Sequence, residues 1–365
     1  MPEPLDTIPR LPKPVGPLSE LVIDLVSSPV QASSADYGMD QVCMDMADHV
    51  TDALADDDLH LALYVLYGLH YRSFRGVDTG WEWHPASVSV AAVLEARFNE
   101  ALEHAVGNPS VEDISDVGAS LFELESSDEG PPLSRRLEFE SSADEFREFL
   151  IHRSAYQLKE ADPHSWAIPR LTGPPKTALL EIQFDEYGSG RPERTHSLLF
   201  AKSMSALGLD AREDSHLDRL PGPTLATVNL MTYFGLHRAN RGKIVGHLAM
   251  FEMGSSRPNR AYGNGLRRLG FGEEATDFFD EHVEADAVHE NIAAYDMAGA
   301  LAKQEPGLAD DIIFGATALM LMENRFADNL LKAWEEGRSS LRPPPGNEVT
   351  GSPTALPVSK PPVAA

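Results

Sequence analysis

The segment FFDEHVEADAVHENI contains the residue types of a metal site at helical spacing. His282, Asp286 and His289 are four and then three positions apart. An α-helix turns by about 100° per residue, so these three side chains would project from one face. Two imidazoles and a carboxylate suit a divalent first-row metal. The same helix is rich in glutamate, so this segment alone leaves a solvated acidic face open as the alternative.

A glutamate in an apolar helix is the second candidate ligand. Glu252 lies between Phe251 and Met253 in the run HLAMFEM. A buried carboxylate needs a cation or a metal ion as its partner. The alternative is a glutamate at a helix end that pairs with Arg257 or Arg260.

Glu186 and His196 form a further pair in the segment DEYGSGRPERTH. On an ideal helix two residues with this separation would differ by about 80° in direction, so the pair needs a break in the helix to converge. Gly188, Gly190 and Pro192 supply a reason for such a break. The alternative is a set of exposed acids beside a turn.

His152, Tyr156 and Glu160 share one face of a predicted helix at 144–162. Such a stripe suits either a hydrogen-bonding network around a metal or contact with a substrate. A surface pair of Glu148 with His152 is the alternative. Further candidates for contact with a substrate or with the ligands are Arg153, Lys159 and Trp166.

Taken together, the candidate ligands number three carboxylates and three imidazoles. They are Glu186, His196, Glu252, His282, Asp286 and His289. A single zinc site uses about four ligands, so it would have no use for six. Carboxylate-bridged di-iron sites are built from inward Glu and His on facing helices, and they need a set of this kind.

Helices must position these residues. Apolar residues recur with helical periodicity along most of the chain, and period-2 alternation is almost absent, which predicts an all-α protein. Predicted helices cover roughly 36–72 with an acidic interruption at 55–60, 89–106, 144–162, 177–188, 195–208, 222–237, 240–253, 257–269, 274–303 and 307–337. The predicted domains are a mostly disordered tail at 1–35, an N-terminal helical extension with an acidic linker at 36–142, the main bundle at 143–340 and a disordered Pro-rich tail at 341–365.

Composition restricts the class of partner. The 57 acidic and 30 basic residues give a net charge of −27, which disfavours nucleic acid and anionic membrane surfaces. No apolar run approaches the roughly 18 residues of a membrane span. The lone Cys43 excludes an intrachain disulfide and a CxxC metal site. The N-terminus lacks the pattern of a signal peptide, so we expect a cytoplasmic protein.

Through DEYGSGRPERTH, GHLAMFEM and FFDEHVEADAVH, the sequence resembles the heme-oxygenase-like di-iron oxidases and oxygenases, also called iron-containing redox enzymes. The resemblance covers about 144–337, and the earlier part is similar to the extension of longer bacterial members. It implies a heme-oxygenase-like helical bundle that binds two iron ions and no haem. The ligands that it implies are Glu186, His196, Glu252, His282, Asp286 and His289, with Glu160 as an additional one.

The resemblance also implies a function. We expect an oxidase or oxygenase that activates O2 to oxidise a small organic substrate, such as an amine, an amino acid or a fatty-acid-like molecule. An external electron donor is expected because the chain has no nucleotide-binding fingerprint of the GxGxxG type in a βαβ unit, and a homodimer suits this bundle. One alternative is a metal-free thiaminase-like hydrolase, for which Cys43, upstream of the matched region, is a poor nucleophile. The other is a non-catalytic helical binding protein.

Overall fold

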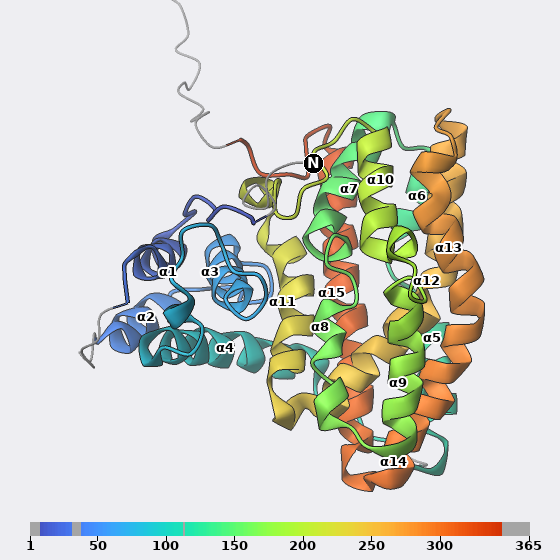
Figure 1. The fold of residues 1–365 in the computed structure, drawn as a ribbon, viewed down its shortest axis with the longest axis horizontal. Coiled ribbons are helices and arrows are strands. Elements are labelled where there is room, and N and C mark those ends of the chain that lie inside the picture. Colours follow the sequence, from blue (N-terminus) through green and yellow to red (C-terminus); the bar gives the residue numbers. More distant parts are fainter. Residues whose placement is uncertain (1–7, 31–37, 112–113, 345–365) are drawn as a thin grey trace, which may run out of the picture.

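The computed structural model describes residues 8–30, 38–111 and 114–344, apart from the side chains of residues 115 and 284–287. Within these ranges the regular elements are helices, and no strand is present. The prediction of an all-α protein is therefore confirmed. Figure 1 shows a tall bundle with a smaller group of N-terminal helices against one side.

Four helices form the N-terminal unit. They are α1 (Pro17–Ser27), α2 (Met39–Ala47), α3 (Asp57–Gly68) and α4 (Pro85–Val106). The Asp56 carboxylate caps α3 by accepting hydrogen bonds from the backbone N–H groups of Asp58 and Leu59. Helix α3 is buried on most sides because it packs between α1 and α11 (Gly222–Leu236) of the bundle. The N-terminal unit and the bundle therefore share one hydrophobic core.

The structure corrects the predicted disordered tail at 1–35. Residues 17–27 form α1, in which Leu18, Val22 and Val26 recur at intervals of four and are buried. The backbone N–H groups of Leu18 and Ser19 donate to the Asp58 carboxylate at 2.8 and 2.7 Å. An isolated helix this short is marginal in water, so its stability comes from packing on α3, which the local pattern does not reveal.

The structure also corrects the predicted acidic linker within 36–142. Two short helices, α5 (Val117–Ser126) and α6 (Leu133–Phe139), lie in that part of the chain and pack against the bundle. Each buries a pair of apolar residues: Val117 with Leu121, and Leu133 with Leu137. The polar majority of their residues faces outward, which made the segment resemble a linker.

The bundle itself is built from longer helices. These are α7 (Ala143–Gln157), α9 (Gly173–Glu186), α10 (His196–Ala206), α11, α12 (Arg241–Arg268), α13 (Glu273–Asn291) and α15 (Ala309–Glu335). Helix α12 is central and packs on α13, α15 and α6. It is one helix rather than the predicted pair at 240–253 and 257–269, because Pro258 lies inside it without ending it. An internal proline removes one helical hydrogen bond, a loss that tertiary packing can outweigh.

The predicted helix at 274–303 is continuous but not uniform. Helix α13 passes at Ile292 into the π-helical segment η8 (Ile292–Gly299), which is followed by α14 (Ala300–Gln304). Helix α5 packs on η8. A π-helical turn inserts extra residues and changes which face meets the neighbouring helices. The side chains after Ile292 are therefore out of phase with those of α13.

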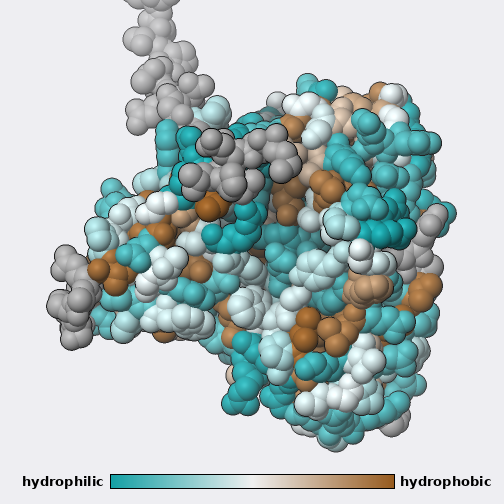
Figure 2. All heavy atoms as spheres, viewed as in Figure 1, coloured by the Kyte–Doolittle hydropathy of each residue, from teal (hydrophilic) through white to brown (hydrophobic). Residues whose placement is uncertain are grey.

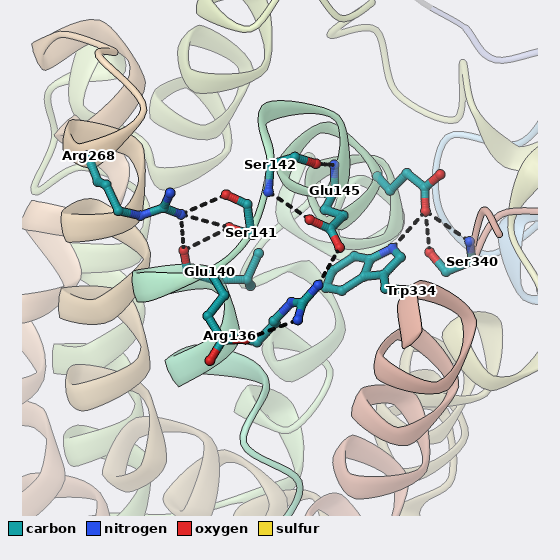
Figure 3. A network of polar contacts seen from close by, with 10 residues as sticks. Arg136, Glu140, Ser141, Ser142, Glu145, Arg268, Trp334 and Ser340 are labelled. Atoms are coloured by element: carbon teal, nitrogen blue, oxygen red, sulfur yellow. Dashed lines mark hydrogen bonds and ion pairs between the residues drawn. The ribbon is translucent and has the colours of Figure 1, made fainter. Parts of the chain in front are cut away.

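A polar network fastens the corner between α6 and α7 (Figure 3). The Ser142 hydroxyl caps α7 by accepting from the Glu145 N–H at 3.2 Å, and Glu145 also pairs with Arg136 at 2.9 Å. The Arg268 guanidinium donates to the Ser141 carbonyl at 2.7 Å, which ties this corner to the end of α12. The network therefore fixes the start of α7.

The surface is mostly hydrophilic on the face drawn in Figure 2, with hydrophobic atoms gathered over the lower part of the bundle. Leu180 and Phe184, both on α9, are among the exposed large hydrophobic residues. Of the helices described, none combines the length and apolar character needed to cross a membrane.

Candidate metal centre

The loop between α9 and α10 brings Glu186 and His196 together. Glu186 ends α9 and His196 begins α10, and the Glu186 carboxylate lies 2.9 Å from the His196 Nδ1. Gly188 and Gly190 adopt positive φ angles of 79° and 78° in the loop. A Cβ atom at Gly188 would collide with the Arg191 carbonyl oxygen, so only glycine fits there. The break inferred from the glycines and proline is therefore present in the structure.

The first cluster joins four buried side chains: Glu160, Glu186, His196 and His282. Glu160 approaches the His282 Nε2 at 3.5 Å and the His196 Nδ1 at 4.0 Å. The other ring nitrogen of His282, Nδ1, donates to the Phe278 carbonyl at 2.8 Å, which directs Nε2 into the cluster. Glu160 lies in the turn that follows α7, not in the predicted helix.

The second cluster contains Glu186, Glu252 and His289, all buried. The His289 Nδ1 lies 3.2 Å from the Glu252 carboxylate, and its Nε2 lies 3.2 Å from the carboxylate of Asp185. Asp185 is half-exposed. A carboxylate on the outer nitrogen of a histidine fixes the ring orientation, as is usual around metal sites.

Glu186 belongs to both clusters, and within each cluster the candidate ligand atoms lie within 4.8 Å of one another. Atoms bound to one ion at about 2.0–2.2 Å are separated by distances of this order. Both carboxylate oxygens of Glu160 and the Nδ1 of His196 are buried without a hydrogen bond in proper geometry from any residue in the described ranges. Buried polar atoms that converge without bonding one another fit a site for a cation. The two clusters therefore suit the binding of a metal cation.

The electrostatics of the site are those of buried acids among imidazoles. Burial raises the pKa of the Glu160 carboxyl. Burial also acts to raise the pKa of Glu186, but the surrounding His196, His282 and His289 imidazoles outweigh it and lower this pKa to about 2. Burial lowers the pKa of His289, and the Glu252, Asp185 and Glu186 carboxylates reverse this and raise it to about 9. The centre therefore favours positive charge.

Asp286 lies within α13, one turn after His282 and three residues before His289. Its side chain is outside the described part of the structure. The assignment of Asp286 as a ligand therefore stays a prediction.

The structure separates the two predicted neighbours of the ligands. The Tyr156 ring is buried edge-on to Phe251, and the carboxylates of Glu160, Glu186 and Glu252 add to burial in raising the pKa of its hydroxyl. Tyr156 therefore borders the centre. His152 instead makes its hydrogen bonds with residues outside the two clusters.

Both ring nitrogens of His152 are committed elsewhere. Nδ1 lies 2.7 Å from the Thr224 hydroxyl, and Nε2 lies 3.0 Å from the Ser340 hydroxyl. The Ser340 hydroxyl in turn donates to the Glu148 carboxylate at 2.7 Å. His152 thus connects α7 to α11 and to the segment after α15, so these contacts correct its predicted role beside the metal.

The three candidates for substrate contact lie in different surroundings. Arg153 donates two hydrogen bonds to the Glu323 carboxylate, at 2.9 and 2.7 Å. Lys159 donates to the Tyr64 hydroxyl at 2.7 Å. Trp166 packs edge-on against Tyr71.

A pocket of about 640 Å³ lies beside the centre and is lined by residues of α5 to α7, α10, α12, α13 and α15. Arg153 and Glu323 are on its wall, and so are Phe278 and Pro258. The Phe278 ring also contacts the His282 ring, with centroids 4.4 Å apart. The Phe278 ring therefore lies between the pocket and the first cluster.

Sequence reasoning missed residues that contact or surround the ligands. Asp185 is one of these residues, and in the sequence only its place directly before Glu186 marks it. His164 and His247 form a buried pair with 3.1 Å between His164 Nε2 and His247 Nδ1. These two residues lie far apart in the sequence, so no local spacing connects them.

Residues 147–324 match the profile of a family described as iron-containing redox enzyme. A nitrosourea synthase of Streptomyces achromogenes subsp. streptozoticus is 25% identical over 202 residues, which are 54% of this chain and 42% of that protein. The chain thus spans less than half the length of that relative.

A solved structure of similar shape is a domain of unknown function with a heme oxygenase-like fold from Shewanella denitrificans OS217. The TM-score is 0.49 at 15% identity, over 63% of this chain and 97% of that domain.

The profile match covers α7 to most of α15, the helices that carry the two clusters. This match confirms the resemblance found through the three sequence segments: residues 147–324 are similar to the family of iron-containing redox enzymes.

Proposed function

We propose that the protein is a non-haem di-iron oxidase or oxygenase that uses O2 to oxidise a small organic molecule. The observation that carries this proposal is that one buried carboxylate, Glu186, belongs to two adjacent His/Glu clusters. Two bound Fe(II) ions would supply the electrons with which O2 is activated. An external electron donor, a homodimer and the absence of haem remain part of the proposal.

Different residues would hold each of the two ions of such a centre. Glu160, His196 and His282 would hold one ion, and Glu252 and His289 the other. Glu186 would bridge the two and offset their charge. Phe278 shields the first cluster from the pocket, and a shielded site strengthens every electrostatic interaction inside it.

The pocket beside the centre is the proposed substrate site. Its inner wall includes Phe149, Phe200 and Met253, which suit an apolar molecular body, and its polar atoms include those of Arg153 and Tyr262. Because one relative is named a nitrosourea synthase, nitrogen-containing substrates come first in a screen.

The test is an anaerobic titration with Fe(II), followed by measurement of O2 uptake with a panel of amines, amino acids and fatty acids. We expect two iron ions per chain and O2 uptake that depends on one class of substrate. Glu186→Ala should lose both ions because both clusters contain Glu186. Glu252→Ala should lose only one.

Glu95→Gln is the matched control. Glu95 is a largely buried acid on α4 that pairs with His237, outside the clusters. This variant should bind two ions like the parent. A parent protein that binds no iron, or a Glu186→Ala variant that still binds two ions, would overturn the proposal.

The surroundings of Cys43 disfavour the alternative of a thiaminase-like hydrolase, which needs a cysteine as its nucleophile. Cys43 is fully buried in α2, and burial together with the Asp40 carboxylate raises the pKa of its thiol to about 11. A reactive cysteine needs a lowered pKa and access to the substrate.

A further inference from the structure

Glu160 depends on a turn rather than a helix for its position. Helix α7 ends at Gln157, and the short helix α8 (Asp162–Ser165) begins two residues after Glu160. Ala161, directly after Glu160, has a φ of 74°, which is unfavourable for a residue with a side chain. A conformation of this kind persists only where the surroundings hold it.

Several contacts hold the turn from inside the bundle. The Gln183 side chain donates to the Ala161 carbonyl at 3.3 Å, and the Ala161 N–H lies 3.5 Å from the Tyr156 hydroxyl. Neither bond is short. The shortest side-chain contact of the turn comes instead from the N-terminal unit.

Lys159 contacts two tyrosines, Tyr64 in α3 and Tyr71 after the end of α3. Its ammonium donates to the Tyr64 hydroxyl at 2.7 Å and lies 4.3 Å from the centre of the same ring. It also lies 5.6 Å from the centre of the Tyr71 ring. A cation over aromatic faces with a hydroxyl acceptor is held more firmly than a surface lysine.

The Tyr64 hydroxyl is itself oriented. It donates to the Asp214 carboxylate at 2.5 Å, so its lone pairs are free to accept from Lys159. Asp214 adopts a φ of 56° in the loop after α10. The chain of contacts therefore runs from this loop through α3 to the residue directly before Glu160.

We propose that Lys159, held by Tyr64 and Tyr71 of the N-terminal unit, is a positioning residue that directs Glu160 into the first cluster. This inference rests on the proposed function, because it assigns a metal to that cluster. Consecutive side chains in a tight turn point in different directions. Holding the Lys159 side chain against the N-terminal unit therefore directs the Glu160 side chain into the bundle. The N-terminal unit is then a working part of the metal centre.

The test is an anaerobic Fe(II) titration of Lys159→Met and Tyr64→Phe, with iron stoichiometry and affinity as the readout. Each substitution removes one side of the hydrogen bond and keeps most of the apolar volume. We expect one of the two ions to bind at least tenfold more weakly, and the other to bind as in the parent. Lys159→Arg retains a donor and should recover much of the loss.

Tyr71→Phe is the matched control. It removes the hydroxyl that pairs with Thr232 at 3.1 Å but keeps the ring beside Lys159. It should lower the melting temperature and leave iron binding unchanged. Equal loss of iron in Tyr71→Phe and Tyr64→Phe would overturn the proposal, because general destabilisation would then explain both.

Glu160→Ala separates the two proposals. If this variant loses an ion while Lys159→Met and Tyr64→Phe both bind iron like the parent, the positioning role is wrong and the metal site stands. If Glu160→Ala itself binds two ions with the parent's affinity, the assignment of Glu160 to the metal site is wrong.

Discussion

Among single residues, Asp286 is the candidate ligand whose side chain lies outside the described part of the structure. Its backbone lies in α13 between His282 and His289, on the face that the four-then-three spacing defines. Glu186, Glu252 and His289 alone offer the second ion only three ligands. Three protein ligands can suffice for a non-haem iron site, and a carboxylate from Asp286 would add charge neutralisation there.

We therefore predict that Asp286→Ala abolishes the binding of at least one iron ion while the protein stays helical. Iron content and far-ultraviolet circular dichroism measure the two effects. Asp277→Ala, a change of a half-exposed acid on the same helix, should keep both ions. Two bound ions in Asp286→Ala would show that this carboxylate is not a ligand.

For single residues, the spacing of the candidate ligands along a helix could be predicted from the sequence better than the contacts that these residues make. The helical repeat of His282 and His289 survives in the structure because it depends on local geometry alone. Glu160 differs, since α7 already ends at Gln157 and the left-handed residue of the following turn, Ala161, is not a glycine that would mark the place. Asp185 was missed because its contact with His289 joins two helices.

At the scale of elements, α12 and α15 touch backbone to backbone. A Cβ atom at Gly246 would collide with the Ile312 carbonyl oxygen, and one at Gly315 would collide with the Lys243 carbonyl oxygen. Each helix thus uses a glycine to admit the other. Because Glu252 is on α12, this contact also sets the position of one candidate ligand along the bundle.

We predict that Gly246→Ala lowers the free energy of unfolding by at least about 2 kcal/mol, since the backbone of α15 must move to admit a methyl group. Urea unfolding at constant pH measures the effect. Gly254→Ala is the matched control in the same helix, because no neighbouring atom lies near its added Cβ. Helix propensity should make that variant more stable by up to about 1 kcal/mol. Equal stability of the two variants would contradict the close approach.

Most element types, but not all their boundaries, could be predicted. Helices α10, α11 and α15 follow the periodicity and stop signals of the sequence, whereas α7 ends at Gln157, before the predicted end at 162. The continuation of α12 through Pro258 could not be predicted, because packing on both sides overrides the local penalty. Helices α1, α5 and α6 are too short to show their buried faces without the rest of the fold.

At the scale of the whole molecule, buried neutral histidines link stability to pH. Burial lowers the pKa of His60 and of His152 to about 3. In His60 one ring nitrogen donates to the Ala53 carbonyl at 3.0 Å and the other accepts from Asn229 at 3.2 Å, which fixes the neutral form. The unfolded chain would bind protons near pH 6.5, where the folded protein does not.

The direction in which stability changes with pH follows from this difference in proton binding. Above pH 6.5 both states carry neutral imidazoles, and the stability is fully present. Below pH 6.5 the unfolded state takes up protons, so stability falls until about pH 3. For the metal-free protein we predict a loss of about 2 kcal/mol per histidine at pH 5.

Urea unfolding at pH 7 and pH 5 measures this loss. His152→Gln should reduce the difference between the two pH values by about 2 kcal/mol, because glutamine does not titrate. His104→Gln, at an exposed site on α4, should leave the difference unchanged. A difference that His152→Gln does not alter would show that this imidazole is not buried in its neutral form.

The proline inside α12 has a consequence for the pocket. Pro258 has no N–H, so the Gly254 carbonyl, four residues earlier, does not receive its usual bond of the helical ladder. Both residues are on the pocket wall. A guest with an N–H or O–H near Gly254 could supply the hydrogen bond that Pro258 cannot, so we expect the pocket to favour such molecules. Selectivity of this kind would survive every change of side chain on the wall except the replacement of Pro258 itself.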